Sequence, residues 1–399
     1  MYTVADTKML VEEGVISRSA ARIIEERARS TMVTLAINTV LCAGIIFATF
    51  GLIFWLADAF LVAVTGILML GGGLLVLAKG KELYAMFGNA ATLIGAGMLL
   101  GGAGFELTDK YPDIAGWALA LGGMAVAAVT AWDYRGRHLV NRFISGAVFL
   151  MALALHLTGV WYYADQAAFS GMPVHLLWLY SAAAIGLAGW FVDVRLVSAV
   201  AIVPFAQALD TGTFYNFAVY AFYSQEPTLS ILQMTLAIVV GLMVARRADE
   251  SIARHARIHV MMAFVVANLC ALVGSLWGDV VGDHLWGPAR GGWNYENYTT
   301  YRDAIDAFKD TTLVIHEHVY SVIWALALTV TAFFAAHKNL RGLFNAAVTF
   351  GAIHAYTQMF ETFHDEPLAY VVGGLAAIPL AWGMWRLNGW FLEHQQKTD

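Results

Sequence analysis

Long apolar runs separated by short polar connections dominate the chain. A helix needs roughly 20 apolar residues to cross a hydrocarbon core of about 30 Å. Twelve runs approach or exceed that length. They cover residues 32–56, 59–78, 84–106, 113–132, 143–163, 173–191, 196–222, 228–245, 258–281, 313–336, 342–361 and 367–388. The pattern predicts an all-α fold, a polytopic transmembrane helix bundle of about 12 spans.

The segments outside these runs predict a simple domain organisation. Residues 1–31 form a predicted cytoplasmic helical hairpin, in which helices over 7–13 and 18–30 are broken at Gly14 and Ser17 caps the second. Residues 32–388 form the bundle, with an outer loop at 282–312, and 389–399 form a cytoplasmic tail. The first 31 residues contain no apolar signal-peptide core, so we expect the first span to act as the insertion signal.

The distribution of positive charge predicts how these spans are oriented. Of the 23 Lys and Arg, 19 fall in alternate connections and at the two ends of the chain. Because cytoplasmic loops of membrane proteins carry the excess of Lys and Arg, both termini are expected in the cytoplasm. The expected location is the bacterial inner (plasma) membrane.

Composition agrees with this class of protein. Hydrophobic residues make up 59% of the chain, charged residues 13%, and the mean hydropathy is +0.64. A soluble protein of 399 residues with this composition would lack the polar surface to cover its core. The expected partner is the lipid bilayer, with other membrane subunits as an open alternative and no nucleic acid. Cys42 and Cys270 lie on different predicted helices, so the sequence indicates no disulfide framework and no paired-cysteine metal site.

Glycine is concentrated in the second, third and fourth predicted spans. Small residues three or four positions apart allow helix backbones to approach closely in lipid, where no hydrophobic effect draws helices together. We therefore interpret these glycines as packing positions. They are Gly71–Gly73, Gly95, Gly97, Gly101, Gly102, Gly104, Gly116, Gly122 and Gly123.

Two segments resemble known families. The run Leu10–Ser17 (Leu-Val-Glu-Glu-Gly-Val-Ile-Ser), the charged helix after it and the glycine-rich paired spans resemble a widespread uncharacterised family of bacterial multi-spanning membrane proteins. This resemblance covers the first third of the chain and implies no activity. Residues Asp310–Tyr320 are similar to the tenth helix of haem-copper oxidases and nitric oxide reductases, where a His-x-His pair near the outer surface ligates two haems.

The second resemblance implies a metal ion or haem held by His316 and His318. The runs Gly274–Gly278 and Asn294–Tyr295 are also similar to the reductases. However, the second span has no His, and the sixth and seventh carry neither a His-x-x-x-Tyr nor a His-His pair. The copper site and one axial haem ligand of that family are therefore missing.

Polar side chains at membrane depth are costly, so they mark candidate sites. His354 and Glu361 share one face of the eleventh span with Gln358. Imidazole and carboxylate groups are ligands for Zn, Fe, Mn or Cu, and together they also suit a proton relay. The candidate metal ligands are His316, His318, His354, Glu361 and Asp279. The candidate relay or ion-binding residues are Asp210, His156 and Glu317.

Other polar residues have simpler interpretations. His255 and His259 are one helical turn apart beside four arginines, a pattern typical of a basic, water-exposed helix that faces lipid headgroups. His284 is interpreted as a solvated loop residue.

Three functions therefore remain open: a metal or haem protein with an outward-facing His/carboxylate site, a proton- or ion-coupled transporter, and a noncatalytic accessory subunit. The sequence identifies neither a substrate nor a reaction.

Overall fold

The computed structural model describes residues 7–56, 58–79, 84–137, 141–216, 219–288 and 298–363, together with nine separate residues between 368 and 386. These residues are almost entirely helical, as predicted. The chain divides into two compact units, which cover Met1–Ala168 and Phe169–Asp399. The sequence pattern did not indicate this division, because the apolar runs continue across it with similar lengths.

Among its described residues, unit 1 is built from five long helices and the short helix α1. They are α1 (Thr7–Glu12), α2 (Arg18–Leu56), α3 (Ala59–Lys79), α4 (Ala85–Lys110), α5 (Pro112–Trp132) and α6 (Arg142–Gln166), with a short π-helix, η2 (Asp133–Arg137), after α5. Ser17 caps α2 as predicted, since its hydroxyl accepts a hydrogen bond from the Ala20 amide at 3.1 Å. The predicted break at Gly14 is present, between the end of α1 and the start of α2. The predicted separation of helix 18–30 from the span at 32–56 is not. The charged helix and the span are one helix of 39 residues, because no helix-breaking residue separates them.

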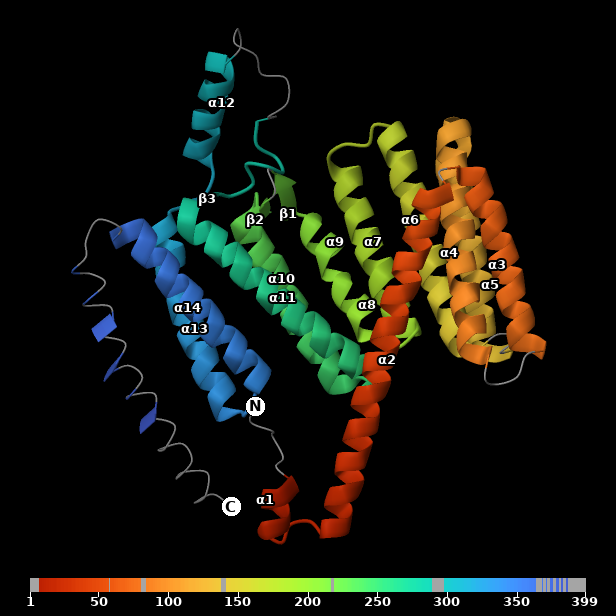
Figure 1. Cartoon of the computed structure of the whole chain (residues 1–399). Helices are drawn as coiled ribbons and strands as arrows, with labels where there is room; N and C mark the ends of the chain where they lie inside the picture. Colours follow the sequence, from red (N-terminus) through yellow and green to blue (C-terminus); the bar gives the residue numbers. More distant parts are fainter. Residues whose placement is uncertain are drawn as a thin grey trace. The chain divides into compact units, whose positions relative to one another are not determined.

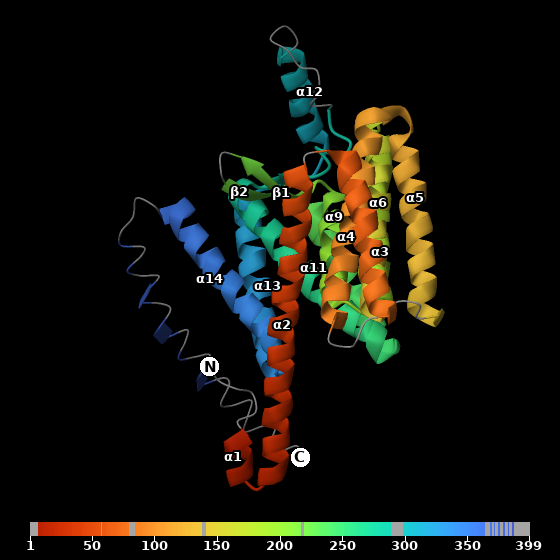
Figure 2. The same ribbon diagram turned by 45° about the vertical axis from the view of Figure 1, so that its right-hand side comes forward.

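Five of the predicted glycines bring helix backbones together: Gly73, Gly95, Gly102, Gly116 and Gly123. A Cβ atom on Gly95 of α4 would lie 2.3 Å from the Leu70 amide nitrogen of α3. One on Gly123 of α5 would lie 2.5 Å from the His156 amide nitrogen of α6. Figure 2 shows the α3 and α4 ribbons side by side. The other predicted glycines differ: nothing lies within 4 Å of the Cβ positions of Gly71, Gly72 and Gly122, and those of Gly97, Gly101 and Gly104 meet only side chains.

Unit 2 combines helices with four short strands (Figure 1). Its helices are α7 (Met172–Phe191), α8 (Arg195–Val200), α9 (Ile202–Gln207), α10 (Pro227–Arg247), α11 (Glu250–Trp277), α12 (Tyr298–Thr311), α13 (Glu317–His337) and α14 (Arg341–Phe363). Strands β1 (Thr211–Asn216) and β2 (Val219–Ser224) form an antiparallel hairpin in which Thr211 pairs with Ser224. Strands β3 (Asp279–Val280) and β4 (Val314–Ile315) pair antiparallel and join α11 to α13.

Within the described residues, eight helices are long and apolar enough to cross a membrane. They are Ala59–Lys79, Ala85–Lys110, Pro112–Gly136, Arg142–Gln166, Met172–Phe191, Pro227–Arg247, Glu250–Trp277 and Glu317–His337. This is the architecture of a multi-pass membrane protein. The expected spans at 32–56 and 342–361 are helical and lie within α2 and α14. The span at 367–388 falls largely outside the described residues, so the count of twelve and the orientation of the termini stay predictions.

The expected span at 196–222 is wrong. Helices α8 and α9 together cover Arg195–Gln207, about 20 Å at 1.5 Å per residue, and the chain then turns through Asp210 into the β1–β2 hairpin. Hydropathy alone does not separate a short apolar strand from part of a helix. The run from 211 to 224 is rich in Thr, Phe, Tyr and Val, which favour strands.

The two ends of unit 2 differ in charge. We call one the hairpin end: it contains β1–β2, the start of α10 and residues 278–285. Both views show β2 beside the end of α11, with α12 projecting beyond (Figures 1 and 2). We call the other the basic end. Its helix termini and turns carry Arg195, Arg246, Arg247, Arg254, Arg257, Lys338 and Arg341.

Candidate functional site

A hydrogen-bonded group around Asp279 joins three segments at the hairpin end. Asp279 follows α11, Thr228 lies in the first turn of α10, and Tyr320 lies in the first turn of α13. The Asp279 Oδ2 atom accepts hydrogen bonds from the Thr228 amide at 2.9 Å, from the Thr228 hydroxyl, and from the Tyr320 hydroxyl at 3.3 Å. The two hydroxyls also contact each other. Asp279 and Tyr320 are each 8% exposed, so this carboxylate is buried with donors around it.

A second carboxylate at this end organises the loop after α11. Glu226 precedes the first residue of α10 and is fully buried. Its two oxygens accept hydrogen bonds of 2.7 Å from the amides of Gly282 and His284, and the Leu285 amide also donates to it. Burial raises the pKa of Glu226 above its ordinary value, with the charge of Asp279 adding to the rise, and the three amide donors oppose both. The Glu226 carboxyl group therefore holds the loop of Gly282, His284 and Leu285 in place. Because the group is buried, its charged form is disfavoured.

Gly282 is required at this loop for two reasons. Its φ of +83° lies in the left-handed region that side chains disfavour, and a Cβ atom there would lie 1.9 Å from the Trp286 ring. The loop thus presents its amides to Glu226 only with glycine at this position.

Beside these carboxylates, a group of hydroxyls ties the hairpin to α10. The Thr211 hydroxyl lies 2.7 Å from that of Ser224 and 2.8 Å from that of Ser230, and the Cys270 thiol contacts all three side chains. All four residues are buried. Because each polar atom has a partner, the hairpin is anchored without a buried unsatisfied hydroxyl.

Two pockets with a mixed polar and apolar lining open between the hairpin and the loop; we call them the outer pockets. One, of 360 Å³, is lined by Asp210, His284 and Tyr223 among others, and the Asp210 carboxylate pairs with the His284 imidazole at 3.2 Å. The other, of 440 Å³, is lined by Asp279 and Asp283 among others. The prediction that His284 is merely solvated is wrong: the hairpin brings Asp210 to it.

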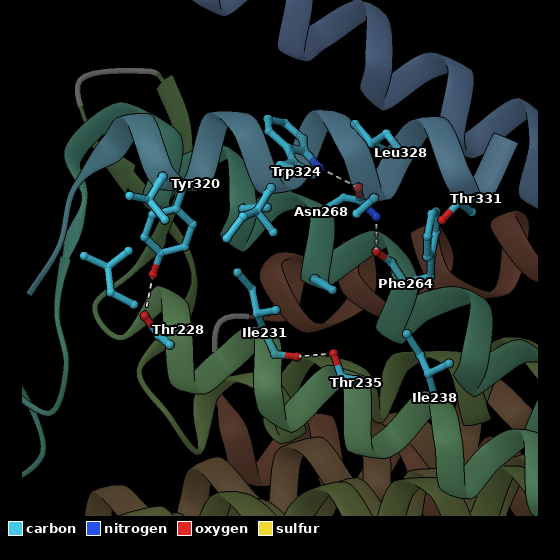
Figure 3. Close-up of a pocket in the computed structure, with 16 residues that line it drawn as sticks. Thr228, Ile231, Thr235, Ile238, Phe264, Asn268, Tyr320, Trp324, Leu328 and Thr331 are labelled. Atoms are coloured by element: carbon cyan, nitrogen blue, oxygen red, sulfur yellow. Dashed lines mark hydrogen bonds between the residues drawn. The ribbon is translucent and has the colours of Figure 1, made fainter. Parts of the chain in front are cut away.

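An apolar groove lies on the other side of the Asp279 group (Figure 3). It has a volume of 380 Å³ and runs between α10, α11 and α13. Thr228 and Tyr320 line one end, and Phe264 and Trp324 line the wall. The Trp324 ring is held in place because its Nε1 donates to Asn268 at 2.8 Å. Two of the dashed lines in Figure 3 mark this bond and the contact of Thr228 with Tyr320.

The predicted metal ligands occupy different surroundings. His316 is exposed at the N-cap position of α13, and His318 is exposed, 3.8 Å from Glu317. His354 is half-buried on α14, edge-on to Trp324 with 4.6 Å between ring centroids. Helices α11, α13 and α14 are neighbours, and α13 and α14 lie side by side in both views (Figures 1 and 2).

Within the described residues, no group of three or more His, Cys, Asp or Glu side chains could hold a metal ion. The Glu361 side chain lies outside the description, so the predicted set stays a prediction. His156 belongs to unit 1, where its Nδ1 lies 2.7 Å from the Ala120 carbonyl oxygen at the α5–α6 contact. That bond is consistent with a packing role.

At the basic end, the interpretation of His255 as a water-exposed residue is wrong. It is 4% exposed, with Nδ1 2.7 Å from the Ser198 hydroxyl and Nε2 3.0 Å from the Asp193 carboxylate. The hydrogen bond between His255 and Asp193, together with the nearby Arg254 guanidinium, holds the pKa of the Asp193 carboxyl below its ordinary value. The residue types match those of a hydrolase triad, but Ser198 is fully buried in α8. A hydroxyl without access to substrate cannot act as a nucleophile. We therefore interpret Ser198, His255 and Asp193 as a structural group that joins α8 to α11.

The most important residues that sequence reasoning missed are Glu226 and Thr228. For Glu226 the sequence did contain a signal: it is an acidic residue immediately before the proline that starts an apolar helix. Its partners lie more than 50 residues away in the chain, and no local pattern identifies them. No family model, curated protein or solved structure matches the chain.

Proposed function

We propose that unit 2 is the binding part of a membrane transporter for small lipophilic cations. The chain has the membrane-length helices that this function requires. The proposed site comprises the apolar groove, the Asp279 group and the outer pockets. Asp279 would hold the positive charge, and the groove would hold the apolar body.

The main support for this proposal is the position of Asp279 between the apolar groove and an outer pocket. Asp279 lines an outer pocket, while its hydrogen-bond partners Thr228 and Tyr320 line the groove. A cation with an apolar body would satisfy both spaces, because a carboxylate attracts the charge and the groove removes apolar surface from water. Binding sites of 300–1,000 Å³ with a few placed polar groups are typical of small ligands.

The surrounding charges favour a cation over an anion. Asp210, Glu226 and Asp283 lie at the same end of unit 2 as Asp279, with the His284 imidazole among them. Trp324 adds a second attraction, since the face of an indole ring binds cations. An anion would meet several carboxylates and is therefore disfavoured.

The same geometry supports passage of the ligand. Thr228 and Tyr320, which line the groove, donate hydrogen bonds to Asp279, which lines the outer pocket. A cation that replaces these donors would open the connection between the two spaces. The β1–β2 hairpin above it is non-helical backbone, which near the bilayer is tolerated where it lines a polar cavity.

Binding and uptake of radiolabelled tetraphenylphosphonium by the purified full-length chain in proteoliposomes would test this function. Asp279→Asn keeps the side-chain shape and removes the charge, and it should weaken binding tenfold or more, about 1.4 kcal/mol. Tyr320→Phe should bind the probe and change the uptake rate, because it removes one of the hydrogen bonds that close the connection.

The matched control is Asp113→Asn, which removes an exposed carboxylate from the first turn of α5 in unit 1. It should leave binding and uptake unchanged. Wild-type protein that neither binds nor takes up the probe contradicts the proposal, as does an Asp279→Asn variant that binds like wild type.

A further inference from the structure

A larger cavity lies near the basic end of unit 2, apart from the groove and outer pockets. It has a volume of 840 Å³, is partly open, and is bordered by α7, α9, α10 and α11 together with Ala201 between α8 and α9. Apart from the indole of Trp190, the polar side chains on its wall are His255 and His259. The volume falls in the range of small-molecule sites, and the lining suits a mainly apolar ligand.

The two imidazoles in this wall have different roles. His255 uses both ring nitrogens, one with Ser198 and the other with Asp193. His259 lies one helical turn further along α11, is half-buried, and has no hydrogen-bond partner among the described residues. Its Nε2 and Cε1 atoms lie 3.8 and 3.9 Å from where a Cβ on Gly186 of α7 would be. His259 therefore brings a polar group with unused hydrogen-bonding capacity to a wall that is otherwise apolar.

The arginines of this end do not line the cavity. Arg254 pairs with Asp193 at 3.2 Å, and Arg257 pairs with Glu250 at 2.9 Å. A phospholipid head inside the cavity would leave its phosphate without a cationic partner, at a high desolvation cost. The lining instead suits a neutral head that accepts one hydrogen bond.

We propose that this cavity binds a membrane quinone, a neutral ring with carbonyl acceptors on an apolar isoprenoid tail. The His259 imidazole N–H donates to one quinone carbonyl. Trp190, at the rim, packs against the ring, and the tail lies between α7 and α10 along Leu179 and Leu236. Ser198 and Asp193 hold His255 as a rigid part of the wall.

Gly186 provides a way to fill the cavity. A Cβ atom there makes only ordinary contacts, the nearest being 3.6 Å from the Ala201 Cβ, so a larger side chain extends into the space beside His259. Gly186→Leu should therefore occupy the place of the ring. Gly122→Leu is its matched control, because it adds the same side chain at a helical glycine with nothing within 4 Å.

Photolabelling in phosphatidylcholine nanodiscs would test the site. The probe is a short-tailed azido-ubiquinone, which is competed with unlabelled decylubiquinone, and labelled peptides are located by mass spectrometry. Labelling should fall on the α7 and α11 segments that contain Gly186 and His259. His259→Leu should raise the competing concentration about fivefold or more, the scale of one lost hydrogen bond. His259→Gln keeps an N–H donor and should stay within about twofold.

Gly186→Leu should lose the labelling, while Gly122→Leu and the groove variant Tyr320→Phe should keep it. The proposal is overturned if labelling is absent or falls elsewhere, or if His259→Leu competes like wild type. It is also overturned if added phosphatidylglycerol displaces the probe as well as decylubiquinone does. Because this cavity is separate from the groove, failure of either test leaves the other proposal standing.

Discussion

Units 1 and 2 are both built from apolar helices, but close backbone approach at glycine is more frequent in unit 1. In unit 1, helix backbones approach at glycines, as at Gly95 against Leu70 and Gly123 against His156. In unit 2, buried side chains such as Glu226 and Asp279 connect segments distant in the sequence. Close backbone packing leaves little freedom for new chemistry. Side-chain networks place titratable groups beside cavities, so the candidate sites belong to unit 2.

The strongest test of this contrast is a pair of neighbouring glycines in α5. Gly123→Leu should unfold the α5–α6 pair, because its Cβ would lie 2.5 Å from a backbone nitrogen that cannot move aside. We expect a loss of about 3 kcal/mol or more in the free energy of unfolding, measured by thermal unfolding in detergent. Gly122→Leu, one residue away, should fold normally. Equal stability of the two variants would contradict the assignment of close backbone packing.

In unit 2 the corresponding test is removal of the Glu226 carboxyl group. Glu226→Ala leaves the amides of Gly282, His284 and Leu285 buried without an acceptor. The expected cost is about 2–3 kcal/mol, with faster amide hydrogen exchange across residues 281–287. Glu226→Gln keeps one acceptor oxygen and should lose less. Unchanged exchange in Glu226→Ala would show that the loop is held by other contacts.

The pH dependence of the stability of unit 2 should reveal the contribution of Glu226. Because the folded-state pKa of Glu226 is raised above its ordinary value of 4.5, the folded state binds more protons than the unfolded state between these two pKa values. The contribution of Glu226 to the free energy of unfolding should therefore fall as pH rises through that window. Glu226→Gln should remove this slope. A slope that persists in the variant would assign the effect to another group.

The smallest expected effect is at the basic end. The pKa of Asp193 is lowered, so its contribution to stability is present above its ordinary value of 3.8 and is lost as pH falls through the folded-state pKa. Its side chain is 48% exposed, and solvent screening should limit the loss in Asp193→Asn to less than about 1 kcal/mol at neutral pH. Differential scanning fluorimetry against Asp113→Asn would measure it. A loss of unfolding free energy in Asp193→Asn as large as that in Glu226→Ala would contradict the expectation that a half-exposed carboxylate contributes less than a buried one.

Features that depend on the average composition of a segment, such as its hydropathy or its glycine content, were predictable from the sequence. The lengths of the apolar runs predict most of the helices, because a helix satisfies its own backbone hydrogen bonds whatever its neighbours are. The concentration of glycines predicted the close packing of α3 with α4 and of α5 with α6. The alternation of Lys and Arg predicted the basic end of unit 2.

Tertiary structure decided which polar groups meet. Asp279 was a candidate from the sequence, yet its partners are Thr228 and Tyr320 rather than His316 and His354. The β1–β2 hairpin replaced an expected span, and it brought Asp210 to His284. The physical reason is that a buried polar side chain is satisfied by whatever donor folding brings within about 3 Å. That proximity depends on helix packing and loop geometry, which no local sequence pattern specifies.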